Sequence, residues 1–89
     1  FYADWCIPCK EFDKFTFSDE SVVSEMKEFI NIKIDMTKSS SPEVERLRKK
    51  FNVIGVPTII IINSKGEEAE RLTGFTNAEQ FLGIINKVQ

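Results

Sequence analysis

The chain has no histidine and only two cysteines among its 89 residues. A structural zinc site needs about four Cys or His ligands, so the cysteine pair alone does not provide one. Covalent haem attachment at a C-x-x-C pair requires histidine directly after the second cysteine, and Lys10 occupies that place. Apolar runs are short as well, and none approaches the roughly 18 residues that a membrane-spanning helix requires.

The chain also lacks a strong excess of charge of either sign. Twelve Lys and Arg face fourteen Asp and Glu, and the net charge is −2. Because the two signs are interspersed, we expect no nucleic-acid partner and no attraction to an anionic membrane surface. The length fits one domain, expected to be monomeric and of modest stability. Eight Phe predict a core rich in aromatic rings.

The most informative stretch is residues 1–10, FYADWCIPCK, which contains both cysteines. A strand-like segment runs through Trp5 into Cys6-Ile7-Pro8-Cys9, and helical periodicity follows immediately. A two-residue spacer at the start of a helix lets the sulfurs reach bonding distance with little distortion. The first cysteine then lies among unpaired helix N–H groups at the positive end of the helix dipole, which favours thiolate. This pattern predicts a redox-active dithiol.

Two plainer interpretations of the pair are a static disulfide and a pair of inert buried thiols. A loop closed over two intervening residues constrains the unfolded chain very little, so such a disulfide would stabilise the fold poorly. In the redox interpretation, Cys6 is the nucleophile because it begins the helix. Cys9, one turn further and expected to be more buried, resolves the mixed disulfide.

Asp13 lies four residues after Cys9 and seven after Cys6, so helical spacing places it on the face that carries both sulfurs. A carboxylate there would disfavour thiolate by charge repulsion and could relay the proton of the resolving cysteine. The alternative is a solvated aspartate paired with Lys10.

Periodicity and cap residues predict the order β-α-α-β-α-β-β-α. Such an order gives a mixed sheet flanked by helices, with right-handed crossovers. Four consecutive Ile predict a strand buried on both faces. In the first half of the chain, the predicted segments are a strand at Phe1–Asp4, a helix at Ile7–Phe15 with Phe12 and Phe15 on one face, a helix beginning at Ser18–Glu20 that buries Val22, Val23 and Met26, and a strand at Phe29–Asp35. A loop at Thr37–Ser41 leads to a helix that Ser41 and Pro42 begin and Asn52 ends. The last predicted segments are strands at Thr58–Ile62 and Ala69–Thr73 around a turn at Asn63–Gly66, and a helix that begins with a capping box at Thr76–Glu79.

The segment FYADWCxxCK resembles the active-site segment of the thioredoxin superfamily. Its continuation EFDKFTFSD at Glu11–Asp19 narrows the resemblance, together with Val22-Val23, Val56-Pro57-Thr58 and Thr73-Gly74-Phe75. With these motifs the chain is similar to the C-terminal periplasmic domain of the DsbD family of transmembrane disulfide reductases. The resemblance covers essentially the whole chain.

This resemblance implies an α/β fold, a thioredoxin-like three-layer sandwich with a mixed four-stranded sheet flanked by helices. The Phe1–Asp4 strand would be central, parallel to Phe29–Asp35 and antiparallel to Thr58–Ile62. The chain begins inside this strand, and burial of a charged amine there would be costly. We therefore expect residues 1–89 to form one thioredoxin-like domain, N-terminally truncated, without the first strand and helix of the full fold.

The resemblance also implies roles for residues outside the cysteine pair. The Val56–Pro57 bond would be cis, with Pro57 packed against the cysteines, and the backbone of Val56 would bind extended substrate as an added strand. Gly74 would let a partner chain approach closely, although it could equally be a plain turn glycine. Independently of the resemblance, Trp5 abuts Cys6, and its position favours a partly exposed ring that lines the contact surface over the alternative of a core aromatic. An acidic residue occupies the place of Asp13 in DsbD-like domains, which favours a functional role for it.

The function implied is thiol–disulfide exchange, with Cys6 and Cys9 passing electrons between dithiol proteins. The redox-active disulfide would be the active group, without metal or cofactor. A membrane-embedded donor would supply electrons, and the domain would work in the periplasm or another extracytoplasmic compartment as part of a membrane-anchored protein. Two alternatives remain, a free-standing cytoplasmic thioredoxin-type reductase and a non-catalytic thioredoxin-like module that binds proteins.

Overall fold

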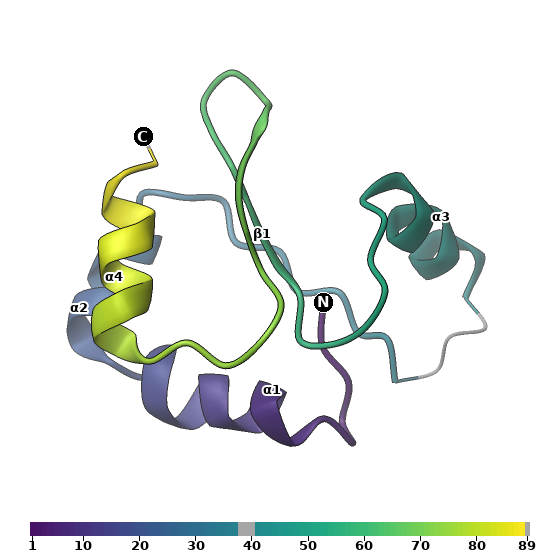
Figure 1. Ribbon diagram of the computed structural model, residues 1–89, viewed down its shortest axis with the longest axis horizontal. Coiled ribbons are helices and arrows are strands. Elements are labelled where there is room, and N and C mark those ends of the chain that lie inside the picture. The colour runs from purple at the N-terminus through teal and green to yellow at the C-terminus, as the bar shows by residue number, and fades with distance from the viewer. Residues whose placement is uncertain (38–40, 89) are drawn as a thin grey trace.

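The structure is a computed structural model that describes residues 1–37 and 41–88. Residues 38–40, within the predicted Thr37–Ser41 loop, lie outside the described residues. Helices and a β-hairpin alternate with extended segments along the chain (Figure 1). The elements in chain order are α1 (Ile7–Glu11), η1 (Phe12–Thr16), α2 (Glu20–Met26), α3 (Pro42–Lys50), β1 (Ile59–Ile62), β2 (Glu68–Leu72) and α4 (Ala78–Asn86).

The helix predicted at Ile7–Phe15 is present, but its second half is a π-helix. α1 begins after Cys6, with Pro8 in the first turn, where its missing N–H needs no partner. From Phe12 the turns widen, and the amide of Phe17 donates to the carbonyl of Phe12 over 2.7 Å. Phe12 is buried, whereas Phe15 is 54% exposed. Of the two rings predicted to lie on one face, only Phe12 therefore belongs to the core, although both lie beside the ring of Phe75.

α2 begins where its cap residues predict. The carboxylate of Asp19 accepts hydrogen bonds from the amides of Ser21 and Val22, which satisfies two N–H groups of the first turn. Val22 is fully buried, but its neighbour Val23 is 39% exposed, contrary to the prediction. Consecutive residues of an α-helix point about 100° apart, so only one of the two valines faces the core.

The hairpin of β1 and β2 is antiparallel, with Ile59 opposite Leu72. Its turn lies at the predicted Asn63–Gly66 segment, and Gly66 has a φ of 81°, a conformation that favours glycine. β2 begins one residue before the predicted strand. The prediction that the isoleucines are buried on both faces is wrong, since Ile61 is buried but Ile62 is 42% exposed. The face of Ile61 packs against α2 and α4, and the face of Ile62 is covered less.

The other two predicted strands are reduced to short pairings beside the hairpin. Tyr2 forms a parallel bridge with Asp35. On the other side, the amine of Phe1 donates to the carbonyl of Thr58 over 2.9 Å, and the amide of Thr58 donates back over 3.2 Å. The predicted neighbours of the first segment are thus present.

The described residues form a two-stranded sheet, however, and not the predicted four-stranded one. The chain leaves the pairing at Asp4, where a turn begins. Ile30 and Ile32 are 93% and 76% exposed, so no neighbouring element covers these two side chains to hold the segment as a strand.

The hairpin lies between two helical layers. In Figure 1, α2 and α4 lie on one side of it and α3 on the other. The main core lies on the side of α2 and α4, and Phe rings from η1 and α4 extend it, as the composition predicts. Phe17 is 5.2 Å from Phe12 and 5.5 Å from Phe81 between ring centroids. The buried members of this core are Val22, Ile61, Phe81, Ile85 and Val88.

Both ends of α3 and the start of α4 lie at or beside the predicted residues. Ser41 is the N-cap of α3, with Pro42 at its first position, and Asn52 after this helix has the predicted left-handed conformation at φ 54°. α4 is capped by Asn77 and not by the predicted Thr76, since the Asn77 carboxamide oxygen accepts from the amide of Gln80. Asn and Thr are both favoured N-cap residues, so the sequence does not indicate which of these two adjacent residues begins the helix.

Candidate redox site

Cys6 and Cys9 form a disulfide at the beginning of α1, with an S–S distance of 2.16 Å and a Cα–Cα distance of 5.2 Å. Cys6 is the N-cap of the helix and has extended backbone angles. Its amide donates to the carbonyl of Ala3 over 3.1 Å, which closes a turn at Asp4-Trp5. The turn therefore leads the extended N-terminal segment directly into the active-site helix.

The sulfur of Cys6 acts as the cap of its own helix. It accepts a hydrogen bond from the amide of Cys9 over 3.1 Å. In a helix the first N–H groups have no intrahelical partner, and their positive ends stabilise a negative charge placed on the axis. A thiolate at Cys6 would receive this stabilisation, whereas Cys9 follows one turn inside the helix.

Both cysteines are buried in the disulfide form. Cys6 is 3% exposed and Cys9 is 6% exposed, so the prediction that Cys9 is the more buried of the two is wrong in this state. The reason is that Cys6 lies beneath the turn, in a small cluster with Ala3, against which Tyr2 and Val56 pack. The distinction between the two sulfurs therefore comes from their places on the helix and not from their exposure.

The Val56–Pro57 peptide bond is cis, which confirms the prediction for this bond. Pro57 is buried, and Val56 packs against the cluster of Cys6 and Cys9. The hydroxyl of Thr58 donates to the carbonyl of Gly55 over 2.6 Å and closes the loop across the proline. Val56, one of the predicted binding residues, thus contacts the cysteine cluster.

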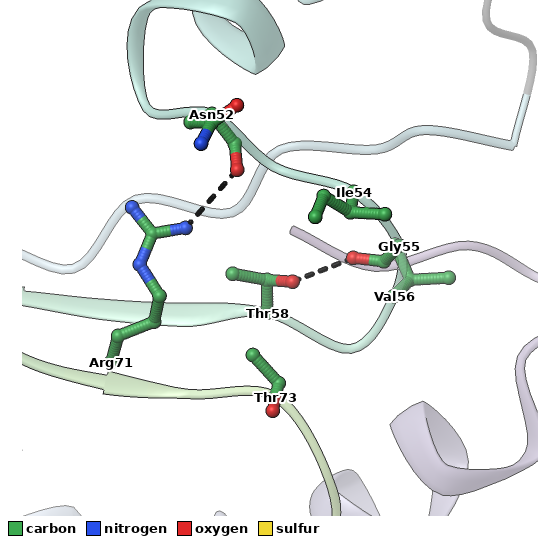
Figure 2. A pocket seen from close by; sticks show the side chains of 7 residues that line it. All are labelled: Asn52, Ile54, Gly55, Val56, Thr58, Arg71 and Thr73. Atoms are coloured by element: carbon green, nitrogen blue, oxygen red, sulfur yellow. Dashed lines mark hydrogen bonds between the residues drawn. The ribbon is translucent and has the colours of Figure 1, made fainter.

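The same loop forms one wall of an open pocket of about 500 Å³ (Figure 2). On the opposite wall, the guanidinium of Arg71 reaches across from β2 and donates to the carbonyls of Phe51 and Asn52 at the end of α3. These bonds fix the point from which the loop departs. The lining residues are Asn52, Ile54, Gly55, Val56, Thr58, Arg71 and Thr73.

Trp5 and Gly74 are both exposed. The indole-bearing residue Trp5 is 66% exposed on the turn before Cys6, so it does not belong to the core. A Cβ added to Gly74 would meet no atom within 4 Å, and its backbone is not in the left-handed region. Neither local strain nor crowding within the chain therefore requires glycine at this position, which disfavours the plain turn interpretation.

The segment after Gly74 is anchored to η1. The ring of Phe75 lies 5.3 Å from that of Phe12 and 6.4 Å from that of Phe15. The hydroxyl of the fully buried Thr16 donates to the carbonyl of Thr76 over 2.6 Å. The π-helix thus links the active-site helix to the exposed Gly74 segment.

Asp13 is exposed on η1 and pairs with Lys33, not with Lys10. The carboxylate oxygen lies 3.8 Å from the ammonium of Lys33, and the Asp13 side chain is 57% exposed. The same ammonium lies 4.7 Å from the centroid of the Tyr2 ring, beside the parallel bridge. No hydrogen bond joins Asp13 to either sulfur among the described residues.

Sequence reasoning missed a tether on the active-site turn. The amide of Asp4 donates to the hydroxyl of Thr37 over 2.8 Å. Thr37 in turn donates to the carboxylate of Asp35 from both its hydroxyl and its amide, and these bonds lower the pKa of Asp35. Only the Asp35–Thr37 part of this tether has a local signal, since an Asp two residues before a Thr is typical of a side-chain-to-backbone turn.

Within residues 1–37 and 41–88, no three His, Cys, Asp or Glu side chains are grouped so as to hold a metal ion. In the same part of the chain, no helix combines the length and apolar character needed to cross a bilayer.

The fold and site together define a thioredoxin-type domain with a C-x-x-C disulfide, and comparison with known proteins agrees. A family model described as a thioredoxin-like domain matches residues 1–89. The C-terminal domain of Neisseria meningitidis DsbD in its reduced form superposes with a TM-score of 0.83 at 33% identity, covering 99% of this chain and 76% of that one. A thioredoxin from Thermus thermophilus, 24% identical with a TM-score of 0.78, shares the fold and covers 97% and 67% of the two chains.

Curated relatives extend the comparison to complete proteins. The thiol:disulfide interchange protein DsbD of Actinobacillus pleuropneumoniae is 45% identical over 89 residues, which is 98% of this chain and 15% of that protein. Its counterpart in Haemophilus ducreyi is 46% identical over 89 residues, which again is 98% of this chain and 15% of that protein. The chain thus spans about 15% of the length of these relatives. It belongs to the thioredoxin-like domain family, in the group of DsbD C-terminal domains.

Proposed function

We propose that this domain carries electrons by thiol–disulfide exchange through Cys6 and Cys9. In the reduced form, the Cys6 thiolate attacks one sulfur of a partner disulfide, which forms a mixed disulfide and releases the first partner thiolate. The Cys9 thiolate then attacks the sulfur of Cys6, which closes the disulfide and releases the second partner thiolate. Two electrons pass to the partner, and a dithiol protein restores the reduced form by the reverse steps.

One observation carries this proposal above the others. The amide of Cys9 donates to the sulfur of Cys6 at the first turn of α1, over 3.1 Å. The bond places a positive dipole at the atom that must hold negative charge, both as attacking thiolate and as leaving group. Cys9 has the complementary position, within bonding distance of the sulfur that it must attack.

The substrate would lie across the loop before Pro57 and the segment at Gly74. Val56 touches the cysteine cluster, and its backbone would pair with an extended partner chain as an added strand. The open space at Gly74 would let that chain approach, and the exposed Trp5 would contact it from the turn before Cys6. Pro57 would hold the strand position beside the sulfurs.

Asp13 would act at longer range. Its carboxylate lies on the helix that carries both cysteines, and it would reduce the thiolate fraction by repulsion and relay the proton of Cys9. The Lys33 ammonium 3.8 Å away offsets part of that charge. The effect would therefore be moderate.

We further propose that the domain works outside the cytoplasm, as the C-terminal reductase domain of a membrane-anchored carrier whose embedded part supplies the electrons. Relatives that bear the name thiol:disulfide interchange protein DsbD are 45% and 46% identical to this chain, while a thioredoxin from Thermus thermophilus is 24% identical. This contrast favours the carrier over a free-standing reductase. The domain itself would act as a monomer.

The activity is tested by insulin reduction with dithiothreitol as the electron source. The chain should accelerate precipitation of the insulin B chain, and Cys6→Ser and Cys9→Ser should each abolish the acceleration. A Ser18→Ala variant, altered on the surface beyond η1, serves as control and should retain it. Wild-type rates equal to dithiothreitol alone would contradict the exchange activity and favour a module that only binds proteins.

The carrier proposal needs a separate test on the complete parent protein. Membrane fractionation, followed by labelling of Cys6 with a thiol reagent that cannot cross the inner membrane, locates the domain. Labelling in intact spheroplasts of a membrane-bound parent is the expected result. A soluble parent that is labelled only after lysis, and that a cytosolic NADPH-linked thioredoxin reductase reduces efficiently, would favour the free-standing reductase.

A further inference from the structure

The turn that delivers Cys6 to the helix is held from outside by a side chain of another segment. Tyr2 pairs with Asp35 in the parallel bridge, where the amide of Tyr2 donates to the carbonyl of Ile34 over 3.0 Å and the amide of Met36 donates to the carbonyl of Tyr2 over 2.7 Å. In a regular parallel ladder, the next amide on the first segment, that of Asp4, would donate to the carbonyl of Met36. It donates instead to the hydroxyl of Thr37 over 2.8 Å.

The hydroxyl of Thr37 is itself held in place. It donates to the carboxylate of Asp35, and the amide of Thr37 donates to the same oxygen over 2.9 Å. The backbone of Asp35 is fixed in turn by its pairing with Tyr2. With its proton committed to the carboxylate, the hydroxyl presents a lone pair to the amide of Asp4, so the group has a defined donor and acceptor direction.

This contact acts on the residues that precede the nucleophile. Asp4 is the second residue of the turn that the amide of Cys6 closes on the carbonyl of Ala3 over 3.1 Å. The direction in which Cys6 enters α1, and with it the aim of its sulfur at the amide of Cys9, depends on that turn. The exposed Trp5 is carried by the same turn.

We propose that Thr37, oriented by Asp35, is a positioning residue that holds the Ala3–Cys6 turn and so keeps the Cys6 sulfur at the helix N-terminus. The inference rests on the proposed thiol–disulfide exchange, because it assigns Thr37 an effect on the reactivity of Cys6. Thr37 touches neither sulfur. It acts through the backbone amide of Asp4.

The primary test compares Thr37→Val, which removes the hydroxyl at nearly constant shape, with Thr37→Ser, which keeps it. Hydrogen exchange of the Asp4 amide, followed by NMR in the disulfide form, reads the tether directly. Alkylation of Cys6 at pH 7 in the reduced chain, resolved by mass spectrometry, reads the position of the sulfur. The net free energy of one hydrogen bond corresponds to about a two- to tenfold change in an exchange or alkylation rate. We expect Thr37→Val to speed Asp4 exchange and slow Cys6 alkylation within this range, and Thr37→Ser to stay near wild type.

A matched control separates positioning from general loosening. The carboxamide of Asn63 accepts from the amides of Lys65 and Glu67 over 2.9 and 3.0 Å, a similar turn at the far end of the hairpin from α1 (Figure 1). Asn63→Ala should lower the unfolding temperature by a similar amount as Thr37→Val but leave Asp4 exchange and Cys6 alkylation unchanged. Equal changes in Asn63→Ala and Thr37→Val would overturn the proposal, as would a Thr37→Val variant that matches wild type in both readouts.

If Thr37→Val does not fold, Asp35→Ala gives the same readouts, because it leaves the hydroxyl in place without its acceptor. Faster Asp4 exchange and slower Cys6 alkylation in that variant support the proposal, and wild-type values overturn it. Failure of the wild-type chain to reduce insulin would contradict the proposed function alone. The exchange and alkylation rates report the tether without any partner protein.

Discussion

The amide of Cys9 donates a hydrogen bond to the sulfur of Cys6 over 3.1 Å, across the first turn of the helix that both residues begin. The two sulfurs are nearly equally buried, at 3% and 6% exposure of their residues, so accessibility does not distinguish them. Their chemical difference lies in the direction of this bond. Among the described residues, only the sulfur of Cys6 receives a helix N–H group, and the first prediction follows from that asymmetry.

In the reduced chain at neutral pH, Cys6 should be alkylated faster than Cys9, by on the order of tenfold. The helix N–H groups stabilise its thiolate, which is the reactive form, and Cys9 has no such donor. Timed alkylation followed by peptide mass spectrometry measures both rates in one sample. Equal rates, or a faster Cys9, would reverse the assignment of nucleophile and resolving thiol.

Asp13→Asn should raise the rate of Cys6 or Cys9 alkylation at pH 7 by about twofold, because removal of a nearby negative charge increases the thiolate fraction. Lys33→Gln should have the opposite effect, since the ammonium 3.8 Å from Asp13 offsets that charge. Both effects should shrink in 1 M salt, where surface charges are screened. Rates that match wild type in both variants would leave Asp13 as a surface ion-pair partner only.

The ion pair of Glu68 and Arg71 should make stability depend on pH in the acid range. The hydrogen bond from Arg71 lowers the pKa of Glu68 below its ordinary value of 4.5, so the folded state favours the ionised carboxylate. This contribution is complete above the pKa of the unfolded chain and is lost as the pH falls through the lower folded-state pKa. Glu68→Gln should therefore be less stable than wild type at pH 7, and the difference should be smaller at pH 3, where protonation weakens the ion pair.

Urea unfolding at both pH values measures this difference. Glu67→Gln is the matched control, because its carboxylate makes no ion pair within the described part of the chain. A difference between wild type and Glu68→Gln that persists unchanged at pH 3 would show that the ion pair is not its source.

Thr16→Val should destabilise the fold by about 1–2 kcal/mol, because the fully buried hydroxyl donates to the carbonyl of Thr76 and the replacement leaves that acceptor without its partner. The same change should loosen the segment at Gly74, which this bond ties to η1. Chemical unfolding and hydrogen exchange at Phe75 measure the two effects. Thr73→Val, at an exposed threonine, should change neither, and a stable Thr16→Val variant would show that the bond contributes little.

Much of the fold follows from local signals in the sequence. Asp19, Ser41 and Asn52 occupy the cap and terminal positions that their side chains favour, and Gly66 marks the hairpin turn. These predictions succeed because each rests on a backbone preference of one residue. The cysteine pair and the cis bond before Pro57 were recognisable from motifs that occur together in one family.

The failures share a different cause, namely contacts between segments distant in sequence. Ile30 and Ile32 alternate with polar residues as in a strand, but both are exposed. A strand is stable only where other elements cover its apolar face, and the alternation alone does not show whether they do. Lys33 replaces Lys10 as the partner of Asp13, since the fold brings the segment at 29–35 beside η1. The bonds of Thr37 to Asp4 and of Thr16 to Thr76 span 33 and 60 residues, and no local pattern specifies such pairs.

The most direct test of the central claim is to trap the mixed disulfide in the Cys9→Ser variant. Reaction with a model disulfide such as the Ellman reagent should attach one equivalent of thionitrobenzoate to Cys6, and peptide mass spectrometry should locate it there. In wild type the same adduct should resolve within the chain, release a second equivalent of thionitrobenzoate and leave the Cys6–Cys9 disulfide. Stable adducts on the wild-type chain, without release of the second equivalent, would contradict the exchange mechanism.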